Sequence, residues 1–180
     1  ADPVHKVSII ARGMAGGFTL ALPEEDRTLM ARNKLLADMV GLLGGRAAEE
    51  LVFNDITSGA SNDLERVTRM ARAMVTRLGM SETLGPMVYG QKDELIFLGR
   101  EISEQRDYSE TVAEQIDKEV RSIVNEAYEK AKGILVDYRD MLEAVANKLL
   151  EVETISREEF EEIFPPPEPK TSGTPLPLAA

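Results

Sequence analysis

Residues 109–136 of this chain read SETVAEQIDKEVRSIVNEAYEKAKGILV. Within this stretch, apolar side chains recur every three or four residues, at Val112, Ile116, Val120, Ile123, Ala127, Ala131 and Ile134. That spacing matches the period of an amphipathic helix, whose apolar side is buried against other elements. The stretch therefore predicts a long helix that builds a helical bundle.

Further helices are predicted on both sides of this stretch. Apolar residues follow the same period over residues 27–53, over residues 60–78 and again over residues 139–151. A short helix ending near Phe164 is predicted after Ser156, because the sequence SREE that begins at Ser156 has the spacing of a capping box. Helices thus account for most of the predicted structure.

Two glycines, Gly44 and Gly45, lie inside the helix predicted over residues 27–53. Glycine within a helix costs about 1 kcal/mol relative to alanine. The pair is therefore predicted either to break the helix or to permit a close packing contact.

Two short segments near the start of the chain have the character of strands. Residues 5–11, HKVSIIA, alternate and are rich in β-branched side chains, and residues 17–22, GFTLAL, resemble them after a glycine-containing turn. They predict a β-hairpin, and residues 86–98 allow a second small hairpin or an irregular loop. The predicted fold class is mainly α, with one or two small β-hairpins.

The composition limits the classes of function. The chain has 180 residues and a formal net charge of −11, which argues against nucleic acid or an anionic membrane surface as the main partner. It has no cysteine and one histidine, His5, so neither a Ser–His–Asp triad nor a zinc site of histidine and cysteine ligands is complete. No apolar run approaches the length of a membrane-spanning helix.

The ends of the sequence suggest a domain and a tail. Residues 165–180 begin with three prolines and are poor in aromatic and branched side chains, so they predict a disordered tail. Residues 1–164 are then predicted to form one domain. Because the first residue is Ala1 and a strand pattern follows at once, we expect the chain to be part of a longer protein.

Asp63 is the residue that most suggests a site. It shares a helix face with Val67, Met70 and Met74, so its carboxylate is predicted to point along an apolar side of the helix. Asp63 can be a metal ligand or catalytic carboxylate, or only an acid that complements the helix dipole. On the preceding helix, at least one of Glu49 and Glu50 is predicted to border the buried stripe and could orient a metal ligand, although such acids are usually solvated.

The second predicted strand offers a different kind of site. Gly17, Phe18, Thr19 and Leu20 form a short strand that could accept an extended peptide along its open edge. Most such edges have no partner function. The glycines of residues 12–17 are interpreted as a turn, because no Lys-Ser or Lys-Thr pair opening a helix follows, as a phosphate loop requires.

Two sequence blocks resemble the peptidase domain of the FtsH family of ATP-dependent zinc metalloproteases. They are LLGGRAAEELVF at residues 42–53 and TSGASNDL at residues 57–64. Shorter blocks are also similar to the family: ADPVHKVSII at residues 1–10, LGPM at 84–87, FLGR at 97–100 and YSET at 108–111. The resemblance covers residues 1–164 and leaves out the proline-rich tail.

This resemblance implies a mostly helical peptidase domain carried on an AAA-type ATPase that uses ATP, with a membrane anchor outside this segment. It further implies a homo-hexamer on the cytoplasmic side of a membrane that unfolds and degrades membrane and soluble proteins. Family zinc is held by two histidines of an HExxH helix and by an aspartate that matches Asp63. The position of Glu49 would support the metal site, and the strand of Gly17, Phe18, Thr19 and Leu20 would receive substrate.

The HExxH motif, which carries two zinc ligands and the general base, does not occur in this sequence. In the family it lies shortly upstream of the block that begins this chain. The 180 residues are therefore expected to contain no catalytic residue, to hold an incomplete zinc site and to be inactive alone, whereas the longer protein would be a zinc endopeptidase. The alternative is a non-catalytic helical oligomerisation or interaction module derived from that domain.

Overall fold

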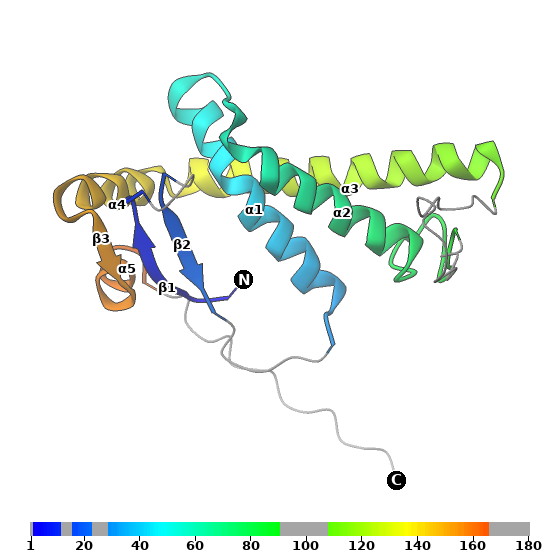
Figure 1. Ribbon diagram of the computed structural model, residues 1–180, viewed down its shortest axis with the longest axis horizontal. Coiled ribbons are helices and arrows are strands. Elements are labelled where there is room, and N and C mark those ends of the chain that lie inside the picture. Colours follow the sequence, from blue (N-terminus) through cyan, green and yellow to red (C-terminus); the bar gives the residue numbers. More distant parts are fainter. Residues whose placement is uncertain (1, 12–15, 23–28, 91–107, 166–180) are drawn as a thin grey trace, which may run out of the picture. The chain divides into compact units, whose positions relative to one another are not determined.

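The computed structural model describes residues 2–11, 16–22, 29–90 and 108–165, and its fold is mainly α with a small antiparallel sheet. Figure 1 shows these helices and strands, coloured by their position in the sequence. The chain divides into two compact units, one formed by Glu25–Arg139 and the other by Asp2–Glu24 and Asp140–Ala180. The two units are described in turn.

Three helices form the first unit. Helix α1 spans Arg32–Phe53, helix α2 spans Ser61–Thr76, and helix α3 spans Glu110–Asp137. A 3-10 turn, η1, at Ser58–Ala60 leads directly into α2. Each helix packs against the other two, and Figure 1 shows α1 and α2 crossing the long helix α3.

The apolar stripes of the three helices meet in one core. The buried residues are Leu35, Met39, Leu43 and Ala47 from α1, Val67, Ala71, Met74 and Val75 from α2, Leu84, and Ile116, Val120, Ile123, Ala127 and Ala131 from α3. The predicted period of α3 is thus confirmed over its middle, whereas Ile134 near its end is 41% exposed. Ser109 caps α3, its hydroxyl accepting a hydrogen bond of 3.3 Å from the amide of Val112.

Helix α1 differs from its prediction in two respects. It begins at Arg32, because residues 29–31 are not helical and the preceding Ala31 is extended without a side-chain cap. The glycine pair neither breaks α1 nor marks a close contact, since a Cβ atom built on Gly44 or Gly45 would have no neighbour within 4 Å. The hydrophobic burial of the other α1 residues outweighs the intrinsic cost of the two glycines.

The segment after α2 returns towards α3 without forming a strand. Helix α2 ends at Thr76, and Gly79, three residues later, has φ of +58°. A Cβ atom at Gly79 would lie 2.9 Å from the Cα atom of Pro86. The hydroxyls of Ser81 and Thr83 each donate a 2.7 Å hydrogen bond to Glu119 of α3. Residues 86–90 are irregular, so the structure shows no hairpin there, and the rest of the predicted hairpin lies outside the described residues.

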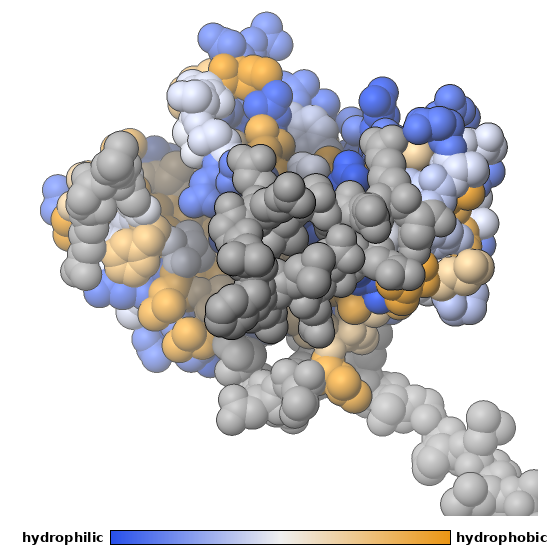
Figure 2. Space-filling model, turned by 45° about the vertical axis from the view of Figure 1, so that its right-hand side comes forward, coloured by the Kyte–Doolittle hydropathy of each residue, from blue (hydrophilic) through white to orange (hydrophobic). Residues whose placement is uncertain are grey.

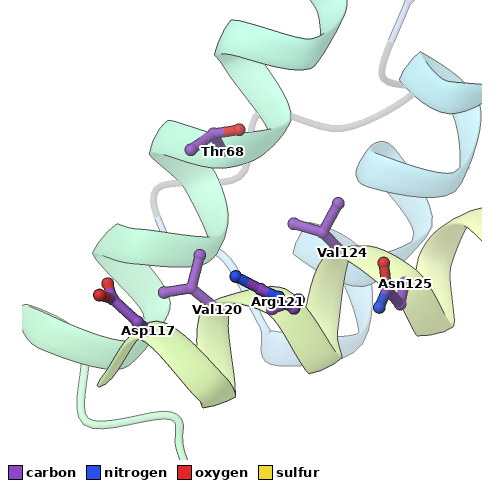
Figure 3. A pocket seen from close by; sticks show the side chains of 6 residues that line it. All are labelled: Thr68, Asp117, Val120, Arg121, Val124 and Asn125. Carbon is purple, nitrogen blue, oxygen red and sulfur yellow. The ribbon is translucent and has the colours of Figure 1, made fainter. Parts of the chain in front are cut away.

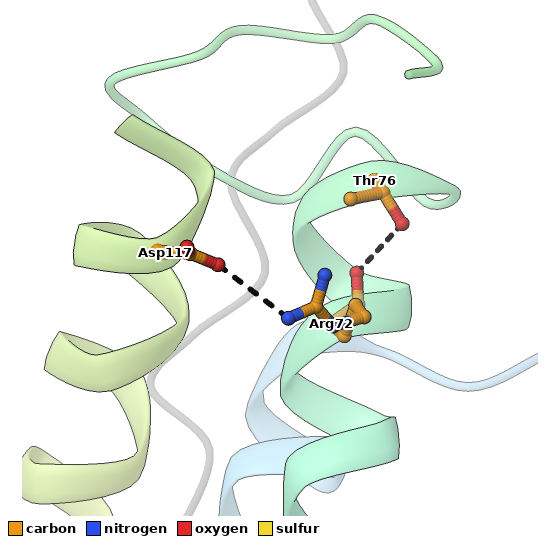
Figure 4. Close-up of polar contacts among 3 residues, drawn as sticks. All are labelled: Arg72, Thr76 and Asp117. Atoms are coloured by element: carbon orange, nitrogen blue, oxygen red, sulfur yellow. Dashed lines mark hydrogen bonds and ion pairs between the residues drawn. The ribbon is translucent and has the colours of Figure 1, made fainter. Parts of the chain in front are cut away.

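An ion pair also links α2 to α3 in this unit. Arg72 Nη2 lies 3.5 Å from Asp117 Oδ1, as Figure 4 shows. One turn further along α2, the hydroxyl of Thr76 donates to the carbonyl of Arg72 at 2.9 Å. The ion pair is exposed to solvent, so its contribution to stability is small.

The second unit holds the three-stranded sheet. Strand β1 at Val4–Ser8 pairs antiparallel with β2 at Phe18–Ala21, which confirms the first hairpin. Strand β3 at Thr154–Ser156, which the sequence did not predict, pairs with the other edge of β1 and gives the order β2-β1-β3. Ile155 of β3 is fully buried.

Two helices complete the second unit. Helix α4 spans Arg139–Val152 and contributes buried Leu149, while helix α5 spans Arg157–Ile163. The capping box is confirmed, with Glu159 N donating to Ser156 Oγ at 3.3 Å and Ser156 N donating to Glu159 Oε2 at 2.9 Å. The tail prediction concerns residues 165–180, of which all but Pro165 lie outside the described residues.

Several apolar residues are exposed on the surface of the described residues. In Figure 2, exposed apolar groups appear as separate patches between hydrophilic ones. Phe53, 73% exposed, and Ile56, 45% exposed, lie in and after the last turn of α1. Among the described helices, none has both the length and the apolar character needed to cross a membrane.

Candidate functional site

Asp63 lies in the first turn of α2, where a carboxylate complements the positive end of the helix dipole. Its side chain is 43% exposed, and its oxygen Oδ1 lies 3.7 Å from Arg66 on the same helix. Val67 and Met74, which share its face, are fully buried in the core. Asp63 therefore sits where the apolar face of α2 reaches solvent, and its carboxylate is accessible to a ligand.

Glu49 fixes the turn that precedes α2. Its carboxylate accepts two hydrogen bonds from Thr57, one of 3.1 Å from the amide and one of 2.8 Å from the hydroxyl. The hydroxyl of Thr57 in turn accepts from the amide of Gly59 at 3.2 Å, so Thr57 caps η1. The bonds from the Thr57 amide and hydroxyl lower the pKa of Glu49 below its ordinary value. Glu49 thus contacts the segment that leads into the helix of Asp63.

The neighbouring residue, Glu50, has partners on a different helix. It accepts hydrogen bonds from the hydroxyl of Tyr128 and, at 3.1 Å, from Nζ of Lys132, both on α3. These contacts lower the pKa of Glu50, the bond from Tyr128 contributing most. Burial and the contact with Glu50 raise the pKa of Tyr128. The sequence suggested that one of the two glutamates borders the buried stripe but gave no sign of these partners.

The strand predicted to receive substrate lies in the second unit. Phe18, Thr19 and Leu20 belong to β2, while Gly17 lies just before the strand. A Cβ atom at Gly17 would lie 2.6 Å from the carbonyl oxygen of Ser8, so this close approach to β1 requires glycine. Strand β2 is at one edge of the sheet, and its side chains from Thr19 to Ala21 are exposed. This is the geometry in which an extended peptide can add to a sheet.

A shallow groove of about 400 Å³ lies between α2 and α3. Figure 3 shows Thr68 on α2 facing five residues of α3, Asp117, Val120, Arg121, Val124 and Asn125. Neither Asp63 nor Glu49 lines this groove. Its lining contains no pair of acid and base groups in contact, so it does not add to the candidate site.

The donor set around Asp63 does not make a metal centre by itself. Catalytic zinc in proteins is held by three side-chain ligands and a water molecule. Within the described ranges, no three histidine, cysteine, aspartate or glutamate side chains lie close enough together to hold a metal ion. An accessible carboxylate at Asp63 fits the role of one ligand, and a zinc site would need further ligands beyond those described.

The sequence matches a known family over nearly its whole length. The model of peptidase family M41 covers residues 1–163. The chain is 53% identical over 178 residues to the ATP-dependent zinc metalloprotease FtsH 1 of Thermomicrobium roseum, covering 98% of this chain and 27% of that protein.

Other relatives give the same picture. Identity is 57% over 167 residues to the ATP-dependent zinc metalloprotease FtsH of Chloroflexus aggregans, covering 91% of this chain and 26% of that protein. Identity is 55% over 164 residues to the protein of the same description in Thermotoga maritima, covering 91% of this chain and 27% of that protein. The chain therefore spans about a quarter of the length of these curated relatives.

Proposed function

Because the chain belongs to peptidase family M41, we propose that it forms part of the peptidase domain of an ATP-dependent zinc metalloendopeptidase in which Asp63 supplies one metal ligand. The observation that carries this proposal is the pair of hydrogen bonds from Thr57 to Glu49. They hold the turn from which α2 begins, and Asp63 lies in the first turn of that helix. Family membership and this local arrangement support the same role for Asp63.

The other components of the zinc site come from outside these 180 residues in this proposal. The sequence contains one histidine, His5, and no HExxH motif, so two histidine ligands and the general base would be supplied by an HExxH helix elsewhere in the protein. Bound zinc acidifies its water molecule towards a pKa of about 7. The role of this chain would be to present the Asp63 carboxylate and keep it in place through Glu49 and Thr57.

Substrate would bind along β2. The exposed edge strand supports the proposal that an unfolded protein segment adds to the sheet next to Thr19, Leu20 and Ala21. Backbone hydrogen bonds in such a complex do not depend on side-chain identity, which suits a protease acting on many sequences. Gly17 would serve by letting the start of β2 approach Ser8 closely.

The relatives are named ATP-dependent zinc metalloproteases, which supports a part of the full protein that uses ATP. We propose that the full protein carries an upstream AAA ATPase domain, assembles as a homo-hexamer and is anchored in a membrane with this domain on the cytoplasmic side. Its substrates would be unfolded or membrane proteins. Residues 1–164 would form the peptidase part, followed by a tail.

Replacement of Asp63 by asparagine tests the proposal. In the protein extended upstream through any HExxH motif, Asp63→Asn should abolish most zinc binding and casein cleavage, since a neutral amide is a poor zinc ligand compared with a carboxylate. Zinc content is measured by elemental analysis and cleavage with labelled casein. Glu65→Gln is the matched control, because Glu65 is an exposed acid two positions further along α2.

Each outcome decides between the candidate functions. Loss of zinc and cleavage in Asp63→Asn alone supports the protease with Asp63 as a ligand. Unchanged zinc and cleavage would leave Asp63 as an acid that only complements the helix dipole. Absence of zinc from the unaltered protein would favour the alternative, a non-catalytic helical oligomerisation or interaction module.

A further inference from the structure

The last turn of α1 contacts two different parts of the first unit through adjacent glutamates. Glu49 accepts from Thr57, in the segment that leads to α2, and Glu50 accepts from Tyr128 and Lys132 on α3. We propose that Tyr128 and Lys132, acting through Glu50, are positioning residues that fix the Glu49–Thr57 contact and hence the first turn of α2 with Asp63. The part of this inference that concerns the metal rests on the proposed function.

Two further contacts fix the same turn of α1. The amide of Asn54 donates to the carbonyl of Glu50 at 3.0 Å, and Asn54 ends the helix with φ of +52°. Nη1 of Arg139, the first residue of α4, donates to the carbonyl of Leu51 at 3.5 Å. Helix ends have carbonyl groups without partners inside the helix, so they fray unless other groups satisfy them. The end of α1 is thus held by three side chains, Tyr128 and Lys132 of α3 and Arg139 at the start of α4.

The Glu50 contacts are suited to orientation more than to stability. The side chains of Glu50 and Lys132 are 40% and 33% exposed, so their ion pair is screened by water and contributes little free energy. The Tyr128 hydroxyl restricts the orientation of the Glu50 carboxylate, because the hydroxyl is carried on a rigid ring. Lys132 Nζ also lies 5.5 Å from the centre of that ring, which keeps the three groups together.

The geometry of the helix carries this restraint from one glutamate to the next. Consecutive helix residues point about 100° apart, so Glu49 and Glu50 face different neighbours while sharing one rigid turn. If Glu50 is held on α3, the direction of Glu49 is fixed as well. Thr57 then has a stationary acceptor for both its amide and its hydroxyl, and η1 and α2 start from a defined point.

Hydrogen exchange of the Thr57 amide, measured by NMR on the 180-residue chain, tests this inference without any metal. In Tyr128→Phe and in Lys132→Met, this amide should exchange about fivefold or more faster, the change expected when a hydrogen bond of ordinary net strength is lost. Lys132→Arg keeps a charged donor for Glu50 and should largely preserve the slow exchange. The side chains of Tyr128 and Lys132 are both partly exposed, so all three variants are expected to fold.

Asp117→Asn is the matched control. It removes the exposed, 3.5 Å ion pair between Asp117 of α3 and Arg72 of α2. This ion pair makes no contact with the end of α1. Thr57 should exchange at its normal rate in this variant. An unchanged Thr57 amide in both Tyr128→Phe and Lys132→Met would overturn the inference. So would a rise of equal size at amides throughout α1 and α3, since this would show a general loss of stability.

A second measurement connects the cluster to the metal. In the longer protein, Lys132→Met should weaken zinc affinity, measured by competition with a chelator, while Asp117→Asn leaves it unchanged. Equal affinity in Lys132→Met and the unaltered protein would contradict the metal part of the inference. If the unaltered longer protein binds no zinc, the proposed function fails, while faster exchange at Thr57 would still establish the positioning role.

Discussion

Glu49 and Glu50 show how two identical neighbouring side chains acquire different roles. Both are acids in the last turn of α1, yet one holds a loop eight positions along the chain and the other holds a helix 78 positions away. The pKa of each glutamate is lowered mainly by a different hydrogen bond. For Glu49 it is the bond from the amide of Thr57, and for Glu50 the bond from the hydroxyl of Tyr128. A lowered pKa means that each carboxylate binds its partners best when ionised.

The contacts of Glu50 predict a pH-dependent contribution to stability. Its pKa in the folded chain lies below the ordinary value of 4.5, so the stabilisation is complete above that value and disappears as the pH falls through the folded-state pKa. Glu50→Gln cannot ionise. We expect this variant to be less stable than the unaltered chain at pH 7 and the difference to vanish at low pH, as measured by urea unfolding.

Glu114→Gln provides the control for this prediction. Glu114 is exposed on α3, about 20 Å along the helix from Tyr128. Its substitution should not reproduce the pH-dependent difference seen for Glu50. A constant difference between Glu50→Gln and the unaltered chain from pH 3 to pH 7 would show that the ionised form of Glu50 gains nothing from its partners.

At the scale of elements, capping explains where some helices begin. Ser156 was recognisable as a helix start from the capping-box spacing, and the structure confirms it. Ser109 also caps its helix in the structure, because its hydroxyl accepts from the amide of Val112. Helix α1 has no such signal at Ala31, and its start was placed too early. Periodicity alone marks which residues face the core but does not mark the first residue of a helix.

The capping box of α5 gives a prediction for one element. Ser156→Ala removes the acceptor for the amide of Glu159 and should lower the free energy of unfolding by about 0.5–2 kcal/mol. Chemical denaturation measures this change. Glu159→Gln should have a smaller effect, because glutamine can still accept from the amide of Ser156.

Ser122→Ala serves as the comparison for that experiment. Ser122 is exposed in the middle of α3, where its hydroxyl donates to Glu126 at 2.9 Å and caps no helix. Alanine favours a helix interior, so this substitution should be neutral or slightly stabilising. If Ser156→Ala were equally neutral, the hydrogen bonds of the box would not determine the stability of α5.

At the scale of the whole molecule, the candidate site residues are divided between two compact units. Asp63 and Glu49 belong to the helical unit, and β2 belongs to the unit with the sheet. The described residues bring together no set of three metal-binding side chains. That residues 1–164 form one peptidase domain stays a prediction, as does the origin of the other zinc ligands outside this chain.

The incomplete donor set predicts how the isolated chain behaves with metal. The 180 residues should neither bind zinc tightly nor cleave casein, because a single carboxylate on the surface binds zinc weakly compared with three converging ligands. Isothermal titration with zinc, repeated on Asp63→Asn, measures this. Tight binding of one zinc ion per chain that is lost in Asp63→Asn would contradict the prediction.

The sequence by itself determined the helical fold class, the first hairpin, the capping box and the family. These features are local, since periodicity, cap spacing and motif blocks are each encoded within a short window of the chain. Only the tertiary structure decided that Glu50 accepts a hydrogen bond from Tyr128 and that β3 pairs with β1. It also decided that Glu119 accepts hydrogen bonds from Ser81 and Thr83. A pattern of apolar residues states which side of an element is buried, but the element that covers it, and thus every distant polar partner, is set by how the stripes pack together.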